Sequence, residues 1–409
     1  MRDIELYRQI LGLEKPWSVS KVELNVGGQQ VDVWVEHEPL VRWPCPECQR
    51  KLVCRDHGQE RAWRHLDTCQ FKTVVHGRVP RVDCPEHGVL QVRVPWAEAR
   101  GRFTLLMERF IIDVLQQCAN VSAAQRLLRI SWDEAWGVMD RAVARGLRRK
   151  KARVIPYLGV DEKAFRKGHQ YMTVVCDLER STVEHIGEDR KAESLVAFYD
   201  RLTPRQRDGI EAVAMDMWEP YVQATVKCVP DARRKIVFDR FHIVSHMGEA
   251  IDTVRRQEHR ALMETGDETL KGTKYLWLYQ EENIPEPKRP LFESLRGLHL
   301  KVGRAWAIGD SLRCLWTYLR EGMARRFFRR WFWWATHSRL KPVARVAHML
   351  RRHLDNVVTY CQHPITNGVA EGLNSKIMTI KRRACGFRNK HHFKTAIYFY
   401  CGGLNLYPR

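Results

Sequence analysis

Val154-Ile155-Pro156-Tyr157-Leu158-Gly159-Val160-Asp161-Glu162 is the stretch that decides the fold of this chain. Its apolar residues run into two carboxylates, and a second apolar run, residues 170–177, follows a segment that contains Gly168. β-Branched and aromatic residues on both sides of a glycine-containing turn are typical of two buried strands joined as a hairpin. A carboxylate at the end of a buried strand loses hydration unless a positive charge meets it. Asp161 is therefore either a structural residue, which pairs with Lys163 or an Arg or caps a turn, or a ligand of a metal ion, and this stretch alone favours neither.

The chain is strongly basic. Of its 409 residues, 69 are Lys or Arg and 48 are Asp or Glu, which gives a formal charge of +21. An excess of this size is typical of a protein that binds a polyanion, usually nucleic acid. The basic residues are interleaved with Trp, Phe and Tyr rather than gathered in one tail. We therefore expect folded nucleic-acid-binding surfaces; the alternative is a basic protein without such a partner.

Chain length, the N-terminal residues and the apolar runs indicate the number of domains and the expected cellular location. With 44% hydrophobic residues, the chain can build two or three domains with proper cores. The charged N-terminus, Met1-Arg2-Asp3-Ile4-Glu5, is unlike a secretory signal, and no apolar run approaches the ~20 residues that cross a bilayer. We expect a cytoplasmic protein, in which the 12 Cys stay reduced and serve metal binding rather than disulfides.

Two motifs of nearly the same sequence predict a zinc site. They are Cys45-Pro46-Glu47-Cys48 and Cys84-Pro85-Glu86-His87. Each motif directs two ligands to one side of a tetrahedron, and two motifs complete it. Strand-like runs at residues 79–82 and 89–94 flank the second motif, so we expect a zinc ribbon with Cys45, Cys48, Cys84 and His87 as ligands.

Other residues compete for this role. Cys54-Arg55-Asp56-His57 has the same spacing, and Cys69 and His76 lie between the two motifs. The matching prolines favour the first set of ligands, and scattered buried thiols are the alternative without a metal.

Residues 103–149 show helical spacing of apolar residues. A short helix from residue 121, with Ser122 as its cap, is followed by a turn and by a longer helix from residue 132, with Ser131 as N-cap. This order is typical of a helix-turn-helix, whose second helix enters the major groove of DNA; the alternative is an ordinary helical hairpin. The candidate DNA contacts here are Arg126, Arg129, Arg141, Arg145, Arg148 and Arg149.

From residue 154 the pattern alternates between strands and helices. Three strands joined by hairpins precede a helix, a strand ending at Asp216, a second helix and a strand near residue 241. This order predicts a mixed sheet covered by helices, and it is the order of the ribonuclease-H-like fold. Residues 262–345 are helical, basic and rich in Trp. We interpret them as an insertion whose aromatic residues form a core, with a DNA-facing rim at Arg325, Arg326, Arg329 and Arg330.

Two further carboxylates occur in settings comparable to that of Asp161. Asp216 ends an apolar run, and side chains at such strand ends converge on one crevice of a mixed sheet; alternatively, it caps the helix that contains Tyr221. Glu371 and Asn374 lie on one face of a helix for which Asn367 is the expected N-cap. Taken alone, Glu371 is equally compatible with a surface ion pair.

Asp161, Asp216 and Glu371 together are hard oxygen ligands, a set that suits Mg²⁺ or Mn²⁺. Three carboxylates held close together repel each other unless cations are bound. Two ions about 4 Å apart would activate a hydroxyl and stabilise the leaving oxygen at a phosphodiester. The triad, the basic charge and the DNA-binding region together indicate metal-dependent cleavage or transfer of DNA strands.

The chain resembles bacterial insertion-sequence transposases of the ISL-three type over nearly its full length. The zinc motifs, Arg64-His65-Leu66-Asp67 and Arg81-Val82-Asp83 resemble the N-terminal region of that family. The motifs that resemble its Asp-Asp-Glu triad are Gly159-Val160-Asp161-Glu162, Asp216-Met217-Trp218 with Tyr221, and residues 367–376. Asp239-Arg240-Phe241-His242 is similar to a carboxylate-x-x-His element of related transposases that carry a helical insertion. His87 is a departure, because the family usually has Cys there.

The resemblance implies an α/β architecture: a ribonuclease-H-like mixed sheet with an inserted all-helical region, preceded by a zinc ribbon and a helix-turn-helix. We expect the zinc ribbon at residues 1–100, the helix-turn-helix at 101–150 and the helical insertion at 246–350. The catalytic core then consists of residues 151–245 and 351–409.

The resemblance also implies a reaction, in which the enzyme cuts DNA at the terminal inverted repeats of its element and the freed 3′-hydroxyl attacks target DNA. Asp161, Asp216 and Glu371 would then hold two Mg²⁺ or Mn²⁺ ions, while structural Zn²⁺ occupies the ribbon. His242 would orient a phosphate or leaving group, and a plain structural role for it is equally open. Further DNA contacts are expected at Asn374, Lys376, Lys381, Arg382 and Arg383.

The partners implied are double-stranded DNA and a second copy of the chain, in a bacterial, nucleoid-associated location. Two alternatives remain: a DNA-binding regulator without catalysis, and a metal-dependent nuclease that cuts without joining. An RNA-binding or structural protein is disfavoured, because no motif of an RNA-binding module is present.

Overall fold

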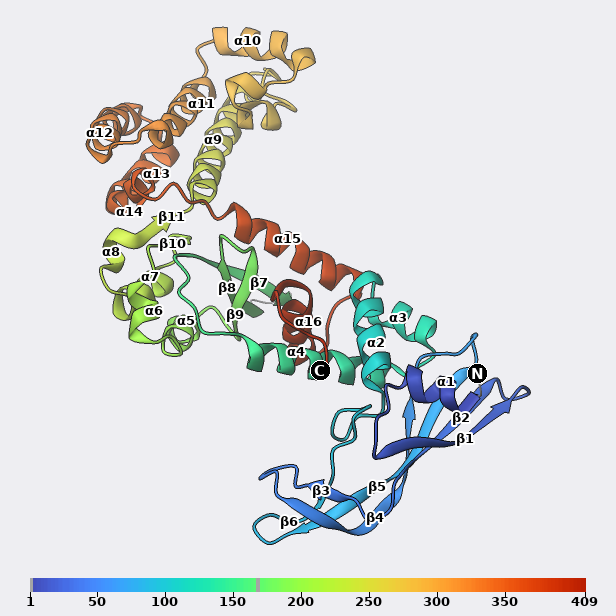
Figure 1. Ribbon diagram of the computed structural model, residues 1–409. Coiled ribbons are helices and arrows are strands. Elements are labelled where there is room, and N and C mark those ends of the chain that lie inside the picture. Colours follow the sequence, from blue (N-terminus) through green and yellow to red (C-terminus); the bar gives the residue numbers. More distant parts are fainter. Residues whose placement is uncertain (1–2, 167–169) are drawn as a thin grey trace. The chain divides into compact units, whose positions relative to one another are not determined.

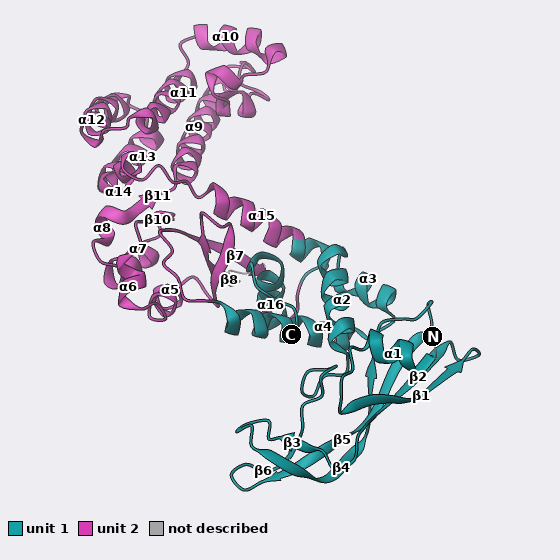
Figure 2. Ribbon diagram, in the orientation of Figure 1, with its two compact units in different colours: residues 1–150, 380–386, 391–409 teal, residues 151–379, 387–390 magenta. Residues whose placement is uncertain are grey.

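The computed structural model describes residues 3–166 and 170–409, which form two compact units (Figure 2). Unit 1 contains residues 1–150, 380–386 and 391–409, and unit 2 contains residues 151–379 and 387–390. The C-terminal residues thus group with the N-terminal unit, whereas the sequence-based division assigned all of 351–409 to the catalytic core. The expected domain boundaries stay predictions. Among the described residues, every helix is too short or too polar to cross a lipid bilayer.

A six-stranded sheet forms the N-terminal part of unit 1 (Figure 1). After helix α1 (Asp3–Ile10) come β1 (Trp17–Asn25), β2 (Gln30–His37), β3 (Arg42–Pro44), β4 (Lys51–Arg64), β5 (Lys72–Cys84) and β6 (Gly88–Gln91). The strand order is β1-β2-β5-β4-β3, with β6 paired to β5. Alternate residues of β2 are buried against Trp17 and Trp63, as expected for a sheet with one buried face. Strands β1 and β2 form an antiparallel hairpin, in which Val22 pairs with Val33.

Three helices follow the sheet: α2 (Leu105–Gln117), α3 (Val121–Leu128) and α4 (Trp132–Arg149). Ser131 caps α4 as predicted, and it forms a reciprocal capping box with Glu134. The predicted cap of α3 was wrong, because the side chain of Asn120, not Ser122, accepts a hydrogen bond from the N–H of Ala123. Arg129 ends α3 in a left-handed backbone conformation, with a φ of 55°, which turns the chain into α4.

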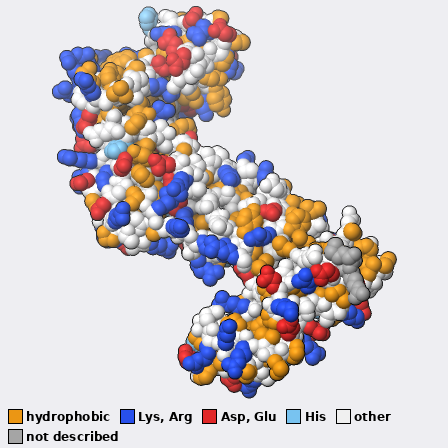
Figure 3. All heavy atoms as spheres, viewed as in Figure 1, with side chains coloured by type: hydrophobic (Ala, Val, Ile, Leu, Met, Phe, Trp, Pro, Cys, Tyr) orange, Lys and Arg blue, Asp and Glu red, His pale blue; other side chains and the backbone are white. Residues whose placement is uncertain are grey.

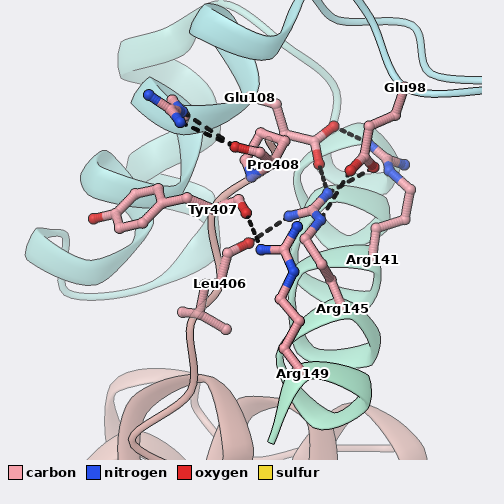
Figure 4. Close-up of polar contacts among 9 residues, drawn as sticks. Glu98, Glu108, Arg141, Arg145, Arg149, Leu406, Tyr407 and Pro408 are labelled. Atoms are coloured by element: carbon pink, nitrogen blue, oxygen red, sulfur yellow. Dashed lines mark hydrogen bonds and ion pairs between the residues drawn. The ribbon is translucent and has the colours of Figure 1, made fainter.

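The C-terminal tail is fastened to α2 and α4 by arginines (Figure 4). Arg145 is 3% exposed and lies 2.6 Å from a carboxylate oxygen of Glu108 and 2.7 Å from one of Glu98. It also donates a hydrogen bond to the carbonyl oxygen of Leu406, while Arg149 donates one to the carbonyl of Tyr407. Arg145 is therefore not a DNA contact, contrary to the prediction, because burial between two carboxylates leaves no surface for a phosphate.

Unit 2 is built on a five-stranded sheet of order β11-β10-β7-β8-β9. Its strands are β7 (Tyr157–Arg166), β8 (Gln170–Asp177), β9 (Thr182–Gly187), β10 (Ala212–Met215) and β11 (Ile236–Phe238). The helices among these strands are α5 (Ala192–Tyr199), α6 (Pro204–Asp208), α7 (Glu219–Cys228) and α8 (Ala232–Lys235). β7, β10 and β11 are parallel, whereas β8 runs antiparallel to β7 and β9. The predicted mixed sheet is thus confirmed, with the three hairpin-linked strands on one side of it.

Strand β7 is longer than the sequence indicated. We expected a strand that ends at Asp161, but β7 continues to Arg166 and pairs Asp161 with Val174 of β8. The prediction failed because the polar residues that follow Asp161 resemble a turn, whereas ladder hydrogen bonds with β8 keep them extended. Of the expected turn at residues 163–168, residues 167 and 168 lie outside the described part of the chain.

Helices follow β11. They are α9 (Arg240–Met263), α10 (Arg289–Gly297), α11 (Lys301–Leu312), α12 (Glu321–His337), α13 (Lys341–Arg352), α14 (Leu354–Val358), α15 (Gly368–Arg383) and α16 (Lys390–Cys401). Short 3₁₀ turns connect several of them. Trp277, Trp306 and Trp331 are at most 3% exposed, so the predicted aromatic core of this region is confirmed.

The buried pair in unit 1 predicts a stability effect. Glu108→Gln leaves the Arg145 guanidinium with less compensating charge, and breaking a buried ion pair costs roughly 3–5 kcal/mol. We expect the free energy of unfolding of unit 1 to fall by about 3 kcal/mol in urea titrations followed by circular dichroism. Glu5→Gln, which removes an exposed pair with Arg8, is the control and should leave the midpoint unchanged. Equal midpoints for Glu108→Gln and wild type would show that the pair contributes nothing.

Candidate active site and zinc cluster

The register of three parallel strands places acidic residues at one edge of the sheet in unit 2. Ala214 of β10 pairs with Gly159 of β7, and Met215 of β10 pairs with Phe238 of β11. Asp216 and Asp239 are the residues that follow directly, and Asp161 is two positions beyond Gly159. Because the carboxyl ends of parallel strands share an edge, these carboxylates form one row.

Asp216, Asp239 and His242 form a tight cluster. One potential ligand atom from each lies within 4.8 Å of the others. Asp239 is the N-cap of α9, where its side chain accepts a hydrogen bond from the N–H of Phe241, and this places His242 in the first turn. Nε2 of His242 lies 2.9 Å from Oδ1 of Asp216. The contact is one of charge rather than an aligned hydrogen bond, since Oδ1 of Asp216 has no hydrogen-bond partner within the described residues.

Asp216 is not a helix cap. Helix α7 begins at Glu219 with Pro220 in its first turn, and its N-cap is Trp218, without a side-chain hydrogen bond. The alternative role that the sequence allowed for Asp216 is therefore excluded. The interaction with Asp216 raises the pKa of His242, which favours an imidazolium next to the carboxylate.

Asp161 is held by a residue far away in sequence. Asn374 of α15 donates a hydrogen bond from Nδ2 to Oδ2 of Asp161, and the N–H of Glu162 lies 2.7 Å from Oδ1. Burial raises the pKa of Asp161 to about 6, and the negative charge of Asp216 acts in the same direction. A carboxyl group of this kind ionises more easily when a cation is next to it.

Glu371 belongs to the same electrostatic group. It lies in the first turn of α15, and its backbone N–H donates to the carbonyl of Asn367 at 2.8 Å. Burial raises the pKa of Glu371, and the charges of Asp239 and Asp216 raise it further, whereas His242 lowers it. Strand β7, the residue that follows β10 and helix α15 thus place Asp161 and Glu371 each within electrostatic reach of Asp216.

A cavity of about 180 Å³ opens beside this row. It is lined by Val160, Asp161, Glu162, Asp216, Met217, Trp218, Tyr221, His242 and His246. Carboxylates with raised pKa values in a small polar cavity are the setting that a hard divalent cation stabilises.

Gly159 of β7 and Asn367, the residue before α15, are packed closely together. A Cβ atom at Gly159 would lie 2.8 Å from Sγ of Cys176 and 3.0 Å from Oδ1 of Asn367, so only glycine fits. Asn367 is fully buried, and its side-chain amide atoms lack hydrogen-bond partners in the described part of the chain. Its predicted role as a side-chain N-cap of α15 was therefore wrong, because the amide lies against β7 instead.

In unit 1, four residues form the predicted zinc cluster. Sγ of Cys84 lies 3.5 Å from Nδ1 of His87 and 3.7 Å from Sγ of Cys48, while Cys45 lies 4.0 Å from His87. Ligand atoms of a tetrahedral zinc site with bonds of about 2.1–2.3 Å are separated by roughly 3.5–3.8 Å. Backbone N–H groups, first that of Glu86, lower the pKa of Cys84 toward the thiolate that binds zinc. Cys54, His57, Cys69 and His76 lie outside this cluster.

The predicted DNA contacts have different surroundings. Arg126 and Arg148 are exposed on α3 and α4, Arg141 is paired with Glu108 at 2.8 Å, and Arg129 is held by Asp67. Asn374 is buried and donates a hydrogen bond to Asp161, so DNA could reach this residue only from the side of the predicted triad. Lys376, Arg382 and Arg383 are exposed on α15, and Lys381 is half-buried.

Asp239 was missing from the predicted site. The signal was present in the sequence, because Asp239 follows the apolar run Ile236–Phe238 just as Asp216 follows Ala212–Met215. The brevity of β11 made this strand easy to misplace, and its predicted end at residue 241 was wrong.

Known families match three successive parts of the chain. A transposase family model (DDE, ISL3) matches residues 158–397, the helix-turn-helix domain of transposase family ISL3 matches 92–143, and the zinc-finger of IS204/IS1001/IS1096/IS1165 transposases matches 42–87. The first match contains the carboxylate row, and the last contains all four residues of the zinc cluster.

Two relatives align over most of the chain. The transposase for insertion sequence element IS1001 of Bordetella parapertussis is 30% identical over 356 residues, which cover 85% of this chain and 86% of that protein. The transposase for insertion sequence element IS1557 of Mycobacterium tuberculosis is 26% identical over 418 residues, with 95% and 93% covered. The zinc ribbon, the helix-turn-helix and the acidic row thus occur together in one chain that belongs to the ISL3 family of insertion-sequence transposases, enzymes that cleave DNA and transfer its strands.

Proposed function

We propose that Asp161, Asp216 and Glu371 hold the divalent ions with which this transposase cuts DNA at the terminal inverted repeats of its element. The observation that carries the proposal is that Asp161 and Asp216 line one cavity, while the charge of Asp216 also acts on Glu371 of α15. Their oxygen donors fit Mg²⁺ or Mn²⁺, and Asp239 is a fourth acidic group within reach. When bound, such ions lower the pKa of an attacking hydroxyl and stabilise the leaving oxygen.

The sheet of unit 2 is, in this proposal, a ribonuclease-H-like core. Three hairpin-linked strands followed by two strand-helix units produce an order with the first strand, β7, in the centre. Supporting this assignment, the acidic residues lie at the carboxyl edge of the parallel strands, where sheets of this type bind ligands. The helices from α9 to α14 then form an insertion between Asp239 and Glu371.

His242 is the residue that positions the phosphate. Its imidazole is half-buried at the cavity and faces Asp216, so a protonated ring can donate a hydrogen bond to a phosphate oxygen. Asn374 fixes Oδ2 of Asp161, a residue that lines the cavity.

End recognition is assigned to the zinc ribbon and the helix-turn-helix. Arg126 and Arg148 are exposed cations near the predicted recognition helix, and they suit contacts with phosphates. Because two ends of an element have to be joined, we propose that two copies of the chain act together on DNA.

Glu371→Gln tests the triad. It keeps the shape of the side chain but removes the charge of a metal ligand, and the loss of several kcal/mol of transition-state stabilisation corresponds to about a thousandfold. We expect cleavage and joining of a labelled DNA with the element's ends to fall by about this factor in Mg²⁺, with unchanged DNA binding. Glu193→Gln, at an exposed position of α5, is the matched control. Equal cleavage by Glu371→Gln and wild type would remove Glu371 from the site.

His242→Ala tests phosphate positioning. We expect end cleavage to fall by roughly 10–100-fold while the melting temperature and DNA affinity stay close to wild type, as for residues that orient reacting groups. Partial recovery with His242→Gln, which retains a hydrogen-bond donor, would support orientation. A large drop in melting temperature with normal cleavage at low temperature would instead show a structural role.

Zinc content tests the cluster in unit 1. Cys84→Ser should abolish stoichiometric zinc, measured by atomic absorption, and should loosen the loops between β3 and β6, since structural zinc supplies folding energy. His87→Cys should retain the metal, because it restores a four-thiolate site. Cys69→Ser, at an exposed Cys, is the control. Retention of zinc by Cys84→Ser would return the choice of ligands to Cys54 and His57.

A further inference from the structure

Helix α12 presents a stripe of basic and aromatic side chains that the active site does not use. The residues that it buries are Ala324, Phe328, Trp331 and Ala335. At 3.6 residues per turn, Arg326, Arg330, Trp333 and His337 fall on the opposite side of the helix, and all four are exposed. The packing of α12 therefore leaves this side of the helix in solvent.

The charges on this side are of one sign. From residue 321 to residue 352, every Asp, Glu, Lys and Arg except Glu321 is basic. Glu321, together with Asp355, is ion-paired with Arg325 at 2.6 and 2.7 Å. Within residues 3–166 and 170–409, the side chains of Arg326 and Arg330 have no ion pair or hydrogen bond to another residue. Figure 3 shows Lys and Arg side chains gathered over α12 at the upper left.

Trp333 lies on the same side of α12 as these cations and is unusually exposed for a Trp. Its side chain is 62% exposed, and one part of its ring system stacks on His337, with centroids 4.6 Å apart and planes 20° apart. Nδ1 of His337 lies 2.8 Å from the carbonyl oxygen of Trp333, which fixes the imidazole in this position. The indole is thus held by His337 of the same helix, and most of its surface stays exposed to solvent.

We propose that Arg326, Arg330 and Trp333 form a binding site for a DNA strand with unpaired bases. The guanidinium groups contact phosphates, and the indole stacks on one exposed base. A fully paired duplex offers phosphates but hides its base faces, so Trp333 distinguishes open DNA from duplex. The site rests on the proposed function in one respect: strand cleavage at an end frees a strand whose terminal bases can separate from their partners and be held there.

The test uses the full-length, zinc-loaded protein without Mg²⁺, so that no DNA is cut. Fluorescence anisotropy measures binding of a single strand of about 20 nucleotides and of its duplex, both unrelated in sequence to the element's ends. For Trp333→Ala we expect about tenfold weaker binding of the single strand and less than about twofold change for the duplex. Trp333→Phe, which keeps an aromatic face, should recover most of the affinity. Tyr275→Ala, at another exposed aromatic residue of this helical region, is the control and should match wild type.

The arginines have a separate readout. The double variant Arg326→Gln/Arg330→Gln should reduce the salt dependence of single-strand binding by about 1.4 in the slope of log K against log salt, because each phosphate contact contributes about 0.7. Arg260→Gln, at an exposed position of α9, should leave the slope unchanged.

Several results would overturn the proposal. Unchanged single-strand binding by Trp333→Ala would remove the stacking site, and an equal loss on duplex would remove the preference for unpaired bases. A lower oligomeric mass of Trp333→Ala in sedimentation equilibrium, with normal DNA binding, would show that the stripe joins two copies of the chain. Because the assay contains no Mg²⁺ and no end sequence, a failure of the triad assignment would leave its outcome unaffected.

Discussion

Repulsion among carboxylates at the edge of the unit 2 sheet is the constraint on which the active site depends. Two unit charges about 5 Å apart repel each other by about 3 kcal/mol at an effective dielectric constant of about 20. The parallel register of β7, β10 and β11 nevertheless places Asp161, Asp216 and Asp239 in one row. His242 offsets part of this charge, and divalent cations would offset the remainder. The surrounding structure supports the arrangement, since Gly159 allows Asn367 to approach β7 and Asn374 to reach Asp161 from α15.

This arrangement links catalysis to the packing of α15. Glu371 and Asn374 lie one turn apart on that helix, so a single rigid element delivers one predicted ligand and the donor that orients another. Sites built on such elements keep their geometry better than sites built on loops. The buried amide of Asn367 at the start of α15 lacks hydrogen bonds in the described structure, which is unfavourable by itself. Its place against Gly159 indicates that close packing of the helix onto β7 outweighs this cost.

The features that were predicted correctly from the sequence are set by residues that lie close together in the chain. The zinc cluster was predicted because each Cys-Pro-Glu motif places two ligands within one turn, and the cap of α4 because Ser131 and Glu134 satisfy each other. The mixed sheet followed from apolar runs that alternate with helical spacing. The assignment of Asp161, Asp216 and Glu371 as metal ligands remains a prediction, because their distances from one another depend on strand register and on α15.

The failures concern long-range contacts. The full extent of β7 depends on pairing with β8, and the packing of residues 391–409 on α2 and α4 depends on partners more than two hundred positions away in sequence. Arg145 illustrates the difficulty, since its sequence context of neighbouring arginines resembles a phosphate-binding surface. Only the folded chain reveals Glu98 and Glu108 around it, because both precede it by more than thirty positions.

The basic charge of the chain therefore divides into two classes that composition cannot separate. The first class consists of arginines that form ion pairs inside the fold. Arg145 is buried between carboxylates, and Arg153 lies 2.6 Å from the buried carboxylate of Asp177. Such pairs add nothing to the field that attracts DNA, because each positive charge is neutralised nearby. The second class consists of arginines whose charge is not paired within the structure. Arg326 and Arg330 belong to it, because they lie on the exposed side of α12 and the nearby acidic residues are ion-paired with Arg325. The net charge of +21 indicates that DNA is bound, whereas the pairing of individual arginines indicates where.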